Sequence, residues 1–99
     1  MKYKTEYGKE MEGVLLGTLK NRKYLHEFLI DLLSPAEYKE TALRWQIIKQ
    51  LYKKIPHRDI SKSLGVSVAT IVRGSRELLN KKGGFSVALE KHFKQKSSK

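Results

Sequence analysis

The hydrophobic residues in the first third of the chain recur at the spacing of an α-helix. Residues 5–20 form one weak stretch of this kind, and residues 22–32 form a shorter second one. The apolar positions that define the two stretches are Met11, Val14, Leu15, Leu19, Leu25, Phe28, Leu29, Leu32 and Leu33. Gly13 and Gly17 lie one turn apart in the first stretch, and we expect them to admit the close approach of another helix.

The clearest local signal is the start of a third helix. Ser34 offers an N-cap hydroxyl, Pro35 suits the first helical position, and Glu37 stands three residues after the serine. We expect this helix to run to about Lys53 and Pro56 to end the region. Its apolar positions form two adjoining stripes: Tyr38, Ala42, Trp45, Ile48 and Tyr52, and Leu43, Ile47 and Leu51. A face this wide is more than one small chain covers, which predicts burial against a second copy.

Residues 57–79 have the pattern of a helix-turn-helix unit. A short helix over 57–64 is followed by Gly65, whose freedom to adopt left-handed backbone suits the turn, and Ser67 can cap a second helix over 68–79. Two short helices that cross need apolar inner faces and a small side chain where they meet. The matching positions are Ile60, Ser61, Leu64, Val66 and Ile71. On this pattern alone, an ordinary helical hairpin is the alternative.

The charge of the chain is strongly positive and unevenly distributed. The 99 residues carry 21 Lys and Arg against 10 Asp and Glu, a net charge of +11. Residues 1–34 hold six basic and five acidic side chains, whereas residues 35–99 hold fifteen and five. A basic segment around a helix-turn-helix pattern favours nucleic acid over a membrane surface as the partner, because neutralised phosphates release their counterions. The length predicts one small domain or half of an obligate dimer.

Other classes of protein are disfavoured by what the chain lacks. No apolar run approaches the length of a membrane span or of a secretory signal core, and there is no cysteine, so we expect a cytoplasmic protein without a membrane partner. His26, His57 and His92 show no metal-ligand spacing, and the Gly83-Gly84 pair lacks the flanking pattern of a phosphate loop. We therefore expect neither an enzyme nor a metal site.

Gly74 stands where the second helix of such a unit normally carries a buried aliphatic side chain. Glycine inside a helix costs about 1 kcal/mol relative to alanine. The space it leaves is needed either by a closely packed backbone or by a ligand lying against the helix. Arg73 precedes it, and Arg44 lies among apolar residues of the third helix. Together these residues suggest a flat or anionic small molecule between two guanidinium groups.

From residue 33 to about residue 79 the chain resembles the tryptophan repressor family. The resemblance is carried by Leu33-Ser34-Pro35-x-Glu37, by Arg44 nine residues after the proline, and by the run Ala69-Thr70-Ile71-x-Arg73-Gly74-Ser75. It implies an all-α, intertwined homodimer in which each chain, a single domain over 1–99 with a flexible tail over about 94–99, carries one helix-turn-helix unit. It also implies a repressor of tryptophan biosynthesis or transport genes, which binds a palindromic operator in double-stranded DNA with L-tryptophan as corepressor.

The same resemblance implies a corepressor site. The positions it carries over are a main-chain carbonyl near Leu33, and Ser34, Arg44, Arg73, Gly74 and Glu77. Arg44 and Arg73 would flank the indole, and Gly74 would leave room for the ring. Ser34 either binds the ligand or only caps its helix. Glu77 replaces the family's serine at the amino group. Its carboxylate either pairs with the ligand's ammonium, or crowds the pocket, or pairs with Arg73 and closes the pocket.

The DNA contacts that the resemblance implies lie on both helices of the unit. They involve Arg58, Ser61, Lys62, Gly65, Ser67, Val68, Ala69, Thr70 and Val72. Arg58 could read guanine, and backbone amides at the start of the second helix could hold a phosphate. A last helix over about 86–93 is expected to serve dimer packing through Phe85, Leu89 and Phe93. The rival function is a helix-turn-helix DNA-binding protein that needs no ligand or responds to a different one.

Overall fold

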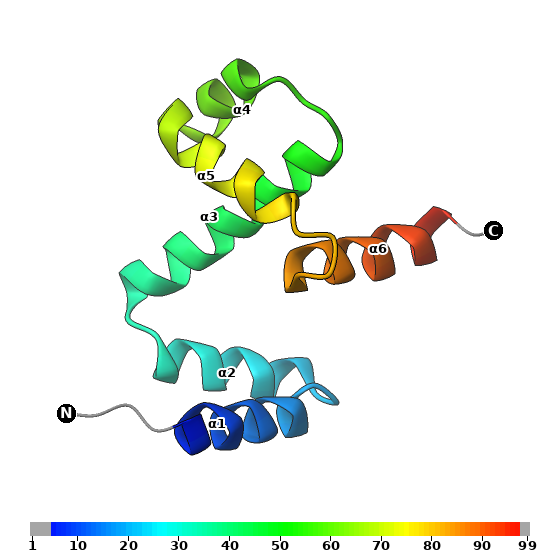
Figure 1. Ribbon diagram of the computed structural model, residues 1–99. Helices are drawn as coiled ribbons and strands as arrows, with labels where there is room; N and C mark the ends of the chain where they lie inside the picture. Colours follow the sequence, from blue (N-terminus) through cyan, green and yellow to red (C-terminus); the bar gives the residue numbers. More distant parts are fainter. Residues whose placement is uncertain (1–4, 98–99) are drawn as a thin grey trace. The chain divides into compact units, whose positions relative to one another are not determined.

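The computed structural model describes residues 5–97 of the chain and its side chains from residue 5 to residue 93 (Figure 1). This part of the chain consists of six helices joined by short loops and contains no strand. The helices are α1 (Thr5–Thr18), α2 (Arg22–Leu32), α3 (Pro35–Tyr52), α4 (His57–Leu64), α5 (Val68–Leu78) and α6 (Gly84–Ser97). The all-α prediction is confirmed, and the helix bounds up to α5 agree with the predicted ones to within two residues.

The contacts divide the chain into two compact units, with the boundary after Lys39 inside α3. In the first unit α1 and α2 contact each other, and the Asn21 side chain caps α2 by accepting hydrogen bonds from two backbone amides. No residue of either helix is buried. A methyl group added at Gly13 or Gly17 would meet no atom within 4 Å, so contacts within the chain do not explain these glycines. This unit therefore leaves many of its apolar side chains exposed and the others, such as Leu25 and Phe28, only half-buried.

The start of α3 is held by a reciprocal pair of hydrogen bonds. The Ser34 backbone amide donates to Oε1 of Glu37 at 2.7 Å, and the Glu37 amide donates to Oγ of Ser34 at 3.1 Å. This confirms the capping pattern predicted from the sequence. The backbone and side-chain hydrogen bonds from Ser34 hold the pKa of the Glu37 carboxyl below its ordinary value, because they favour the charged form.

Pro56 was predicted to end the region of α3. The helix ends earlier, at the left-handed backbone of Lys54. The helix stops at Tyr52, and Lys54 adopts left-handed backbone with φ of 62°. Its amide donates to the carbonyl of Leu51 at 2.9 Å, and the next amide, that of Ile55, reaches back to Gln50 at 3.1 Å. These two bonds satisfy carbonyls that the helix end would otherwise leave unpaired. Pro56 instead directly precedes α4.

The helix-turn-helix unit surrounds a small apolar core in the second unit of the chain. Ile60 of α4 and Ile71 of α5 are fully buried and form one cluster with Ile47 of α3. The residues that pack against this cluster are Leu51, Ile55, Leu64 and Val66. Gly65 ends α4 with φ of 69°, in the left-handed region that the sequence predicted for the turn. The predicted inner positions are thus confirmed as the packed ones.

The last helix packs inside the second unit. It begins at Gly84, two residues before its predicted start, and its Leu89 is fully buried. The ring of Phe93 stacks on Tyr52, with centroids 5.3 Å apart. Leu89 and Phe93, which were predicted to pack across a dimer, therefore find partners within their own chain. Helix α6 continues into the predicted tail, of which residues 98–99 lie outside the described part.

Candidate functional site

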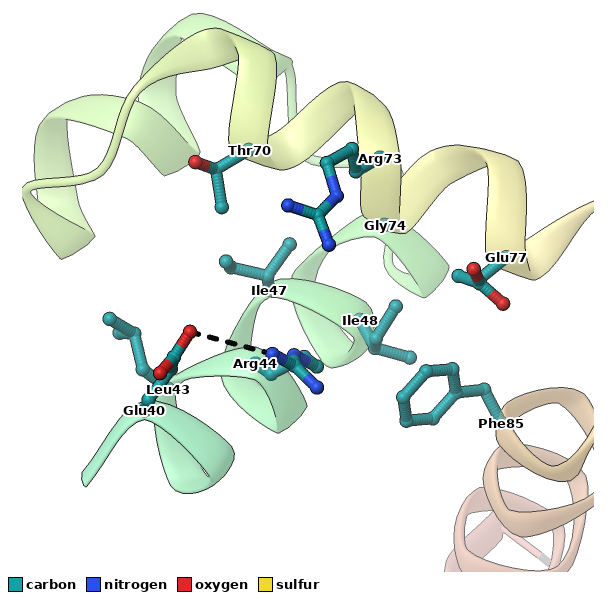
Figure 2. A pocket seen from close by; sticks show the side chains of 10 residues that line it. All are labelled: Glu40, Leu43, Arg44, Ile47, Ile48, Thr70, Arg73, Gly74, Glu77 and Phe85. Carbon is teal, nitrogen blue, oxygen red and sulfur yellow. Dashed lines mark hydrogen bonds and ion pairs between the residues drawn. The ribbon is translucent and has the colours of Figure 1, made fainter. Parts of the chain in front are cut away.

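A pocket of about 390 Å³ opens in the second unit between α3, α5 and the first turn of α6 (Figure 2). Its lining consists of Glu40, Leu43, Arg44, Ile47 and Ile48 from α3, Thr70, Arg73, Gly74 and Glu77 from α5, and Phe85 from α6. The second helix of the helix-turn-helix unit therefore forms one wall of the pocket. The apolar side chains come mainly from α3 and the charged ones from both helices.

Four of the residues predicted to bind the corepressor lie together in this pocket: Arg44, Arg73, Gly74 and Glu77. Leu33 and Ser34 belong to the first unit and are not among the lining residues. The Ser34 hydroxyl accepts the Glu37 amide, so it has the capping role that was one of its two predicted roles. A contribution of Leu33 or Ser34 to ligand binding stays a prediction.

Gly74 lets α5 approach α3 closely. A Cβ atom at this position would lie 3.2 Å from Cγ2 of Ile47 and 3.4 Å from Cδ1 of Ile48. Close packing, one of the two explanations offered for this glycine, is therefore what the structure contains. The same residue also lines the pocket, so a larger side chain would both press on α3 and reduce the space next to Arg73.

The charged groups of the pocket differ in their partners. Nη2 of Arg44 lies 3.5 Å from Oε1 of Glu40, one helical turn earlier on α3. Arg73 and Glu77 stand one turn apart on α5, on either side of Gly74 in sequence, and both are exposed. Among the described residues neither takes part in an ion pair. The predicted alternative in which Glu77 pairs with Arg73 and closes the pocket is therefore not the arrangement found.

Several lining residues were missed by the sequence reasoning. Glu40 could have been found from its position one turn before Arg44, since charges at this spacing on a helix meet. Phe85 was predicted to pack across a dimer, but it lines this pocket from the first turn of α6. No local pattern in the sequence places it next to α3 and α5. Thr70 was predicted only as a DNA contact, but it also lines the pocket.

The residues predicted to contact DNA occupy the exposed side of α4 and the start of α5. Arg58 and Lys62 are exposed on α4, and Val68, Ala69 and Thr70 are exposed in the first turn of α5. Two of the predicted residues are partly buried instead. Ser61 donates a hydrogen bond from its hydroxyl to the carbonyl of Val66 across the turn, and Val72 is half-buried.

Ser67 and Thr70 fix the first turn of α5. The Ser67 hydroxyl accepts the Thr70 amide at 3.1 Å, as the predicted N-cap requires, and the two side-chain oxygens lie 2.9 Å apart. The helix end predicted to face DNA is therefore linked by hydrogen bonds to a residue that lines the pocket.

Two further features bear on the class of protein. Within residues 5–97, no helix is both long and apolar enough to cross a membrane. The same stretch contains no group of three or more His, Cys, Asp or Glu side chains placed to hold a metal ion.

Two short packed helices, a glycine turn and exposed basic side chains define a helix-turn-helix protein with a small-molecule-sized pocket against its second helix. The Trp repressor protein family matches residues 13–93 of the chain. The chain therefore belongs to the Trp repressor family of transcriptional regulators.

Curated relatives agree with this assignment, and each is named a Trp operon repressor homolog. The chain is 49% identical to the protein of Actinobacillus succinogenes over 53 residues. These residues make up 52% of each chain. It is 43% identical over 67 residues to that of Mannheimia succiniciproducens, covering 67% of this chain and 66% of the relative. The relative from Chlamydia trachomatis serovar L2 is 33% identical over 94 residues, which cover 94% of this chain and 100% of the relative. No solved structure gave a significant match.

Proposed function

We propose that this protein is a DNA-binding repressor of tryptophan biosynthesis or transport genes and that L-tryptophan activates it as corepressor. The observation that carries the proposal is the pocket between α3 and α5, which brings Arg44 and Arg73 together beside Gly74. The names of the relatives point to the same role. Because such a repressor acts where its DNA is, the proposal includes a cytoplasmic location.

The chemistry of the pocket suits an aromatic amino acid. Its volume of about 390 Å³ falls within the range of small-molecule sites. Ile47, Ile48 and Phe85 offer apolar surface for a ring, and guanidinium groups stack on aromatic faces as well as pairing with carboxylates. Arg44 and Arg73 can therefore hold an indole and the carboxylate of the same ligand.

The position of the pocket explains how a ligand would act on DNA binding. Arg73, Gly74 and Thr70 belong to the helix whose first turn is predicted to contact DNA. A ligand that contacts α3 and α5 together favours the arrangement of the two helices in which both sets of contacts form. If that arrangement is also the one that fits DNA, operator and ligand must strengthen each other's binding by the same factor.

The exposed face of the unit suits the groove of double-stranded DNA. Arg58 and Lys62 place positive charge on α4, where Arg58 can read guanine and Lys62 can contact phosphate. Val68, 49% exposed in the first turn of α5, suits contact with a thymine methyl group. The amides at the start of α5 favour a phosphate.

A homodimer is proposed because the first unit leaves many of its large apolar side chains exposed. Exposed large hydrophobic residues of residues 5–39 include Tyr7, Met11, Val14, Leu16, Leu19, Tyr24, Ile30 and Leu32. Such a concentration on a small protein marks an interaction surface. A second copy would bury it, and a two-fold dimer with two reading units requires an operator with matching two-fold symmetry.

The test is DNA binding in the presence and absence of L-tryptophan, measured by fluorescence anisotropy on an operator selected from a random double-stranded library. We expect tryptophan to tighten binding of the wild-type protein. Arg73→Ala should abolish this response while leaving weak, salt-dependent DNA binding. An unchanged tryptophan response in Arg73→Ala would contradict the assignment of the pocket.

One observation favours a second candidate, a helix-turn-helix regulator that needs no ligand. Glu40 and Glu77 both line the pocket, and their negative charge disfavours the carboxylate of a ligand. This candidate predicts tight binding to the selected operator without tryptophan and no change when it is added. The same anisotropy experiment therefore separates the two functions.

A further inference from the structure

The side of the pocket at α6 is formed by one aromatic residue. Phe85, in the first turn of α6, is half-buried, and its ring points from that helix toward α3 (Figure 2). Among the described residues that line the pocket, Phe85 alone comes from α6, and the others belong to α3 and α5. The ring of Phe85 therefore sets how far the pocket extends toward α6.

The turn before α6 is wound around Asn80. The Asn80 carbonyl accepts hydrogen bonds from the Gly83 amide at 3.0 Å and the Ser86 hydroxyl at 2.9 Å. Oδ1 of Asn80 accepts a further one from the Lys82 amide at 3.1 Å. A Cβ atom at Gly83 would lie 3.1 Å from the Asn80 carbonyl oxygen, so this turn is tightly packed. These bonds hold the chain on both sides of Phe85.

The rest of α6 is anchored by contacts outside the pocket. Leu89, one turn after Phe85, is fully buried. Near the other end of the helix, the ring of Phe93 stacks on Tyr52 of α3, with centroids 5.3 Å apart. Because α6 is held both at its start and further along its length, the ring of Phe85 moves little when a ligand enters.

We propose that Phe85 sets the size limit of the ring that this pocket accepts. The inference rests on the proposed function, since it concerns the ligand of the same site. Phe85 is a specificity-determining residue because its ring is rigid and its helix is fixed. Arg44 and Arg73 are exposed and carry long side chains with many rotamers, so they can move to admit a larger ligand. A well-packed apolar pocket distinguishes ligands that differ by one methylene group by about tenfold or more.

The experiment is calorimetric titration of the full chain with L-tryptophan and with its 4-, 5-, 6- and 7-methyl derivatives, which place one methyl group at successive positions around the ring. The proteins are wild type, Phe85→Ala, Phe85→Leu and two controls. Leu43→Ala removes an apolar side chain from the α3 side of the same pocket, and Val87→Ala removes one from α6 outside the lining. Thermal unfolding of each variant reports on the fold, and Phe85→Leu provides the test if the alanine variant does not fold.

We expect wild-type protein to bind at least one methyl derivative about tenfold or more weakly than tryptophan, because its methyl group meets Phe85. Phe85→Ala should bind that derivative at least as tightly as tryptophan, and Phe85→Leu should fall between the alanine variant and wild type. Leu43→Ala and Val87→Ala should keep the wild-type preference for tryptophan over this derivative.

Several outcomes would overturn the inference. Equal affinity of wild-type protein for tryptophan and every methyl derivative would show that the pocket has no size limit of this kind. A derivative that Phe85→Ala rejects as strongly as wild type does would place the limit elsewhere. Recovery of the same derivative in Leu43→Ala would reveal a general effect of enlarging the pocket. Each of these results leaves the corepressor function in place if tryptophan still tightens operator binding. If wild-type protein binds none of the compounds, the proposed corepressor function fails together with the inference.

Discussion

Gly74 and Ile47 bring α5 and α3 together at the wall of the pocket: a Cβ atom at position 74 would lie 3.2 Å from Cγ2 of Ile47. Ile47 is 3% exposed and branched at Cβ, so it has little freedom to move away. The contact joins α5, the second helix of the helix-turn-helix unit, to α3, which carries Arg44. Both the packing of the unit and the width of the pocket therefore depend on the absence of a side chain at this position.

Gly74→Ala should separate these two dependences. The gain in helix propensity, about 1 kcal/mol, is offset by crowding against Ile47, so we expect the free energy of unfolding to change by less than about 1 kcal/mol. Ligand affinity should fall, because Gly74 lines the pocket and an added methyl group leaves less room beside it. Urea unfolding and calorimetric titration with L-tryptophan measure the two effects. Gly84→Ala, which meets no atom within 4 Å, is the control; unchanged ligand binding in Gly74→Ala would contradict this account.

Gly65 and Lys54 end their helices with the same left-handed backbone, at φ of 69° and 62°. We expect replacing the glycine and introducing a glycine to have opposite effects on the free energy of unfolding. Gly65→Ala should lower the free energy of unfolding by about 1 kcal/mol, because only glycine adopts this conformation without strain. No atom lies within 4 Å of the added methyl group, so crowding does not contribute.

Lys54→Gly should raise the free energy of unfolding, by at most about 1 kcal/mol, because the strain removed exceeds the added entropy of the unfolded chain. Urea denaturation of both variants provides the measurement. Since Lys54→Gly also removes a charge, Lys54→Gln serves as the charge control, because it removes the same charge and keeps the left-handed strain. Destabilisation by Lys54→Gly would show that the lysine side chain contributes more than its backbone strain costs.

Ser67 is expected to contribute separately to folding and to DNA binding. Ser67→Ala removes the oxygen that accepts the Thr70 amide and should cost about 1 kcal/mol in the free energy of unfolding. Ser67→Asp keeps a good N-cap and should retain stability, yet it should weaken DNA binding because its charge repels phosphate. Urea unfolding and anisotropy compare the variants. Wild-type DNA affinity in Ser67→Asp would place the start of α5 away from the DNA backbone.

The capping pair at the start of α3 makes stability depend on pH. Hydrogen bonds from Ser34 lower the pKa of Glu37 in the folded state below its ordinary value of 4.5. The group therefore stabilises the fold fully above the unfolded-state pKa, and this contribution is lost as the pH falls through the folded-state pKa. Glu37→Gln can still accept a hydrogen bond but does not titrate.

We thus expect the difference in unfolding free energy between wild-type protein and Glu37→Gln to be constant near neutral pH and to shift against the wild type below about pH 4.5. Urea unfolding of both proteins across pH 3–7 measures it. A pH-independent difference would show that the pair does not discriminate between the two protonation states of Glu37.

The sequence predicted local features well where one short stretch contains the whole cause. The N-cap at Ser34, the turn at Gly65 and the cap at Ser67 each depend on residues at most a few positions apart, and the structure contains all three. The end of α3 was predicted to within one residue, but Pro56, a conspicuous helix breaker, was taken as its cause, because nothing in the type of Lys54 indicates left-handed backbone.

The pocket was predicted only in part, and the division has a physical reason. Arg73, Gly74 and Glu77 share one helix, so their common face follows from the helical repeat of the sequence alone. That Arg44 and Ile47 stand across from them, and that Phe85 closes one side, was decided by how α3, α5 and α6 pack, since these contacts join residues far apart in the chain. The sequence by itself determined the helices, their caps and the charges they carry. Tertiary packing decided which of those charges line one pocket, including the ion pair of Glu40 and Arg44.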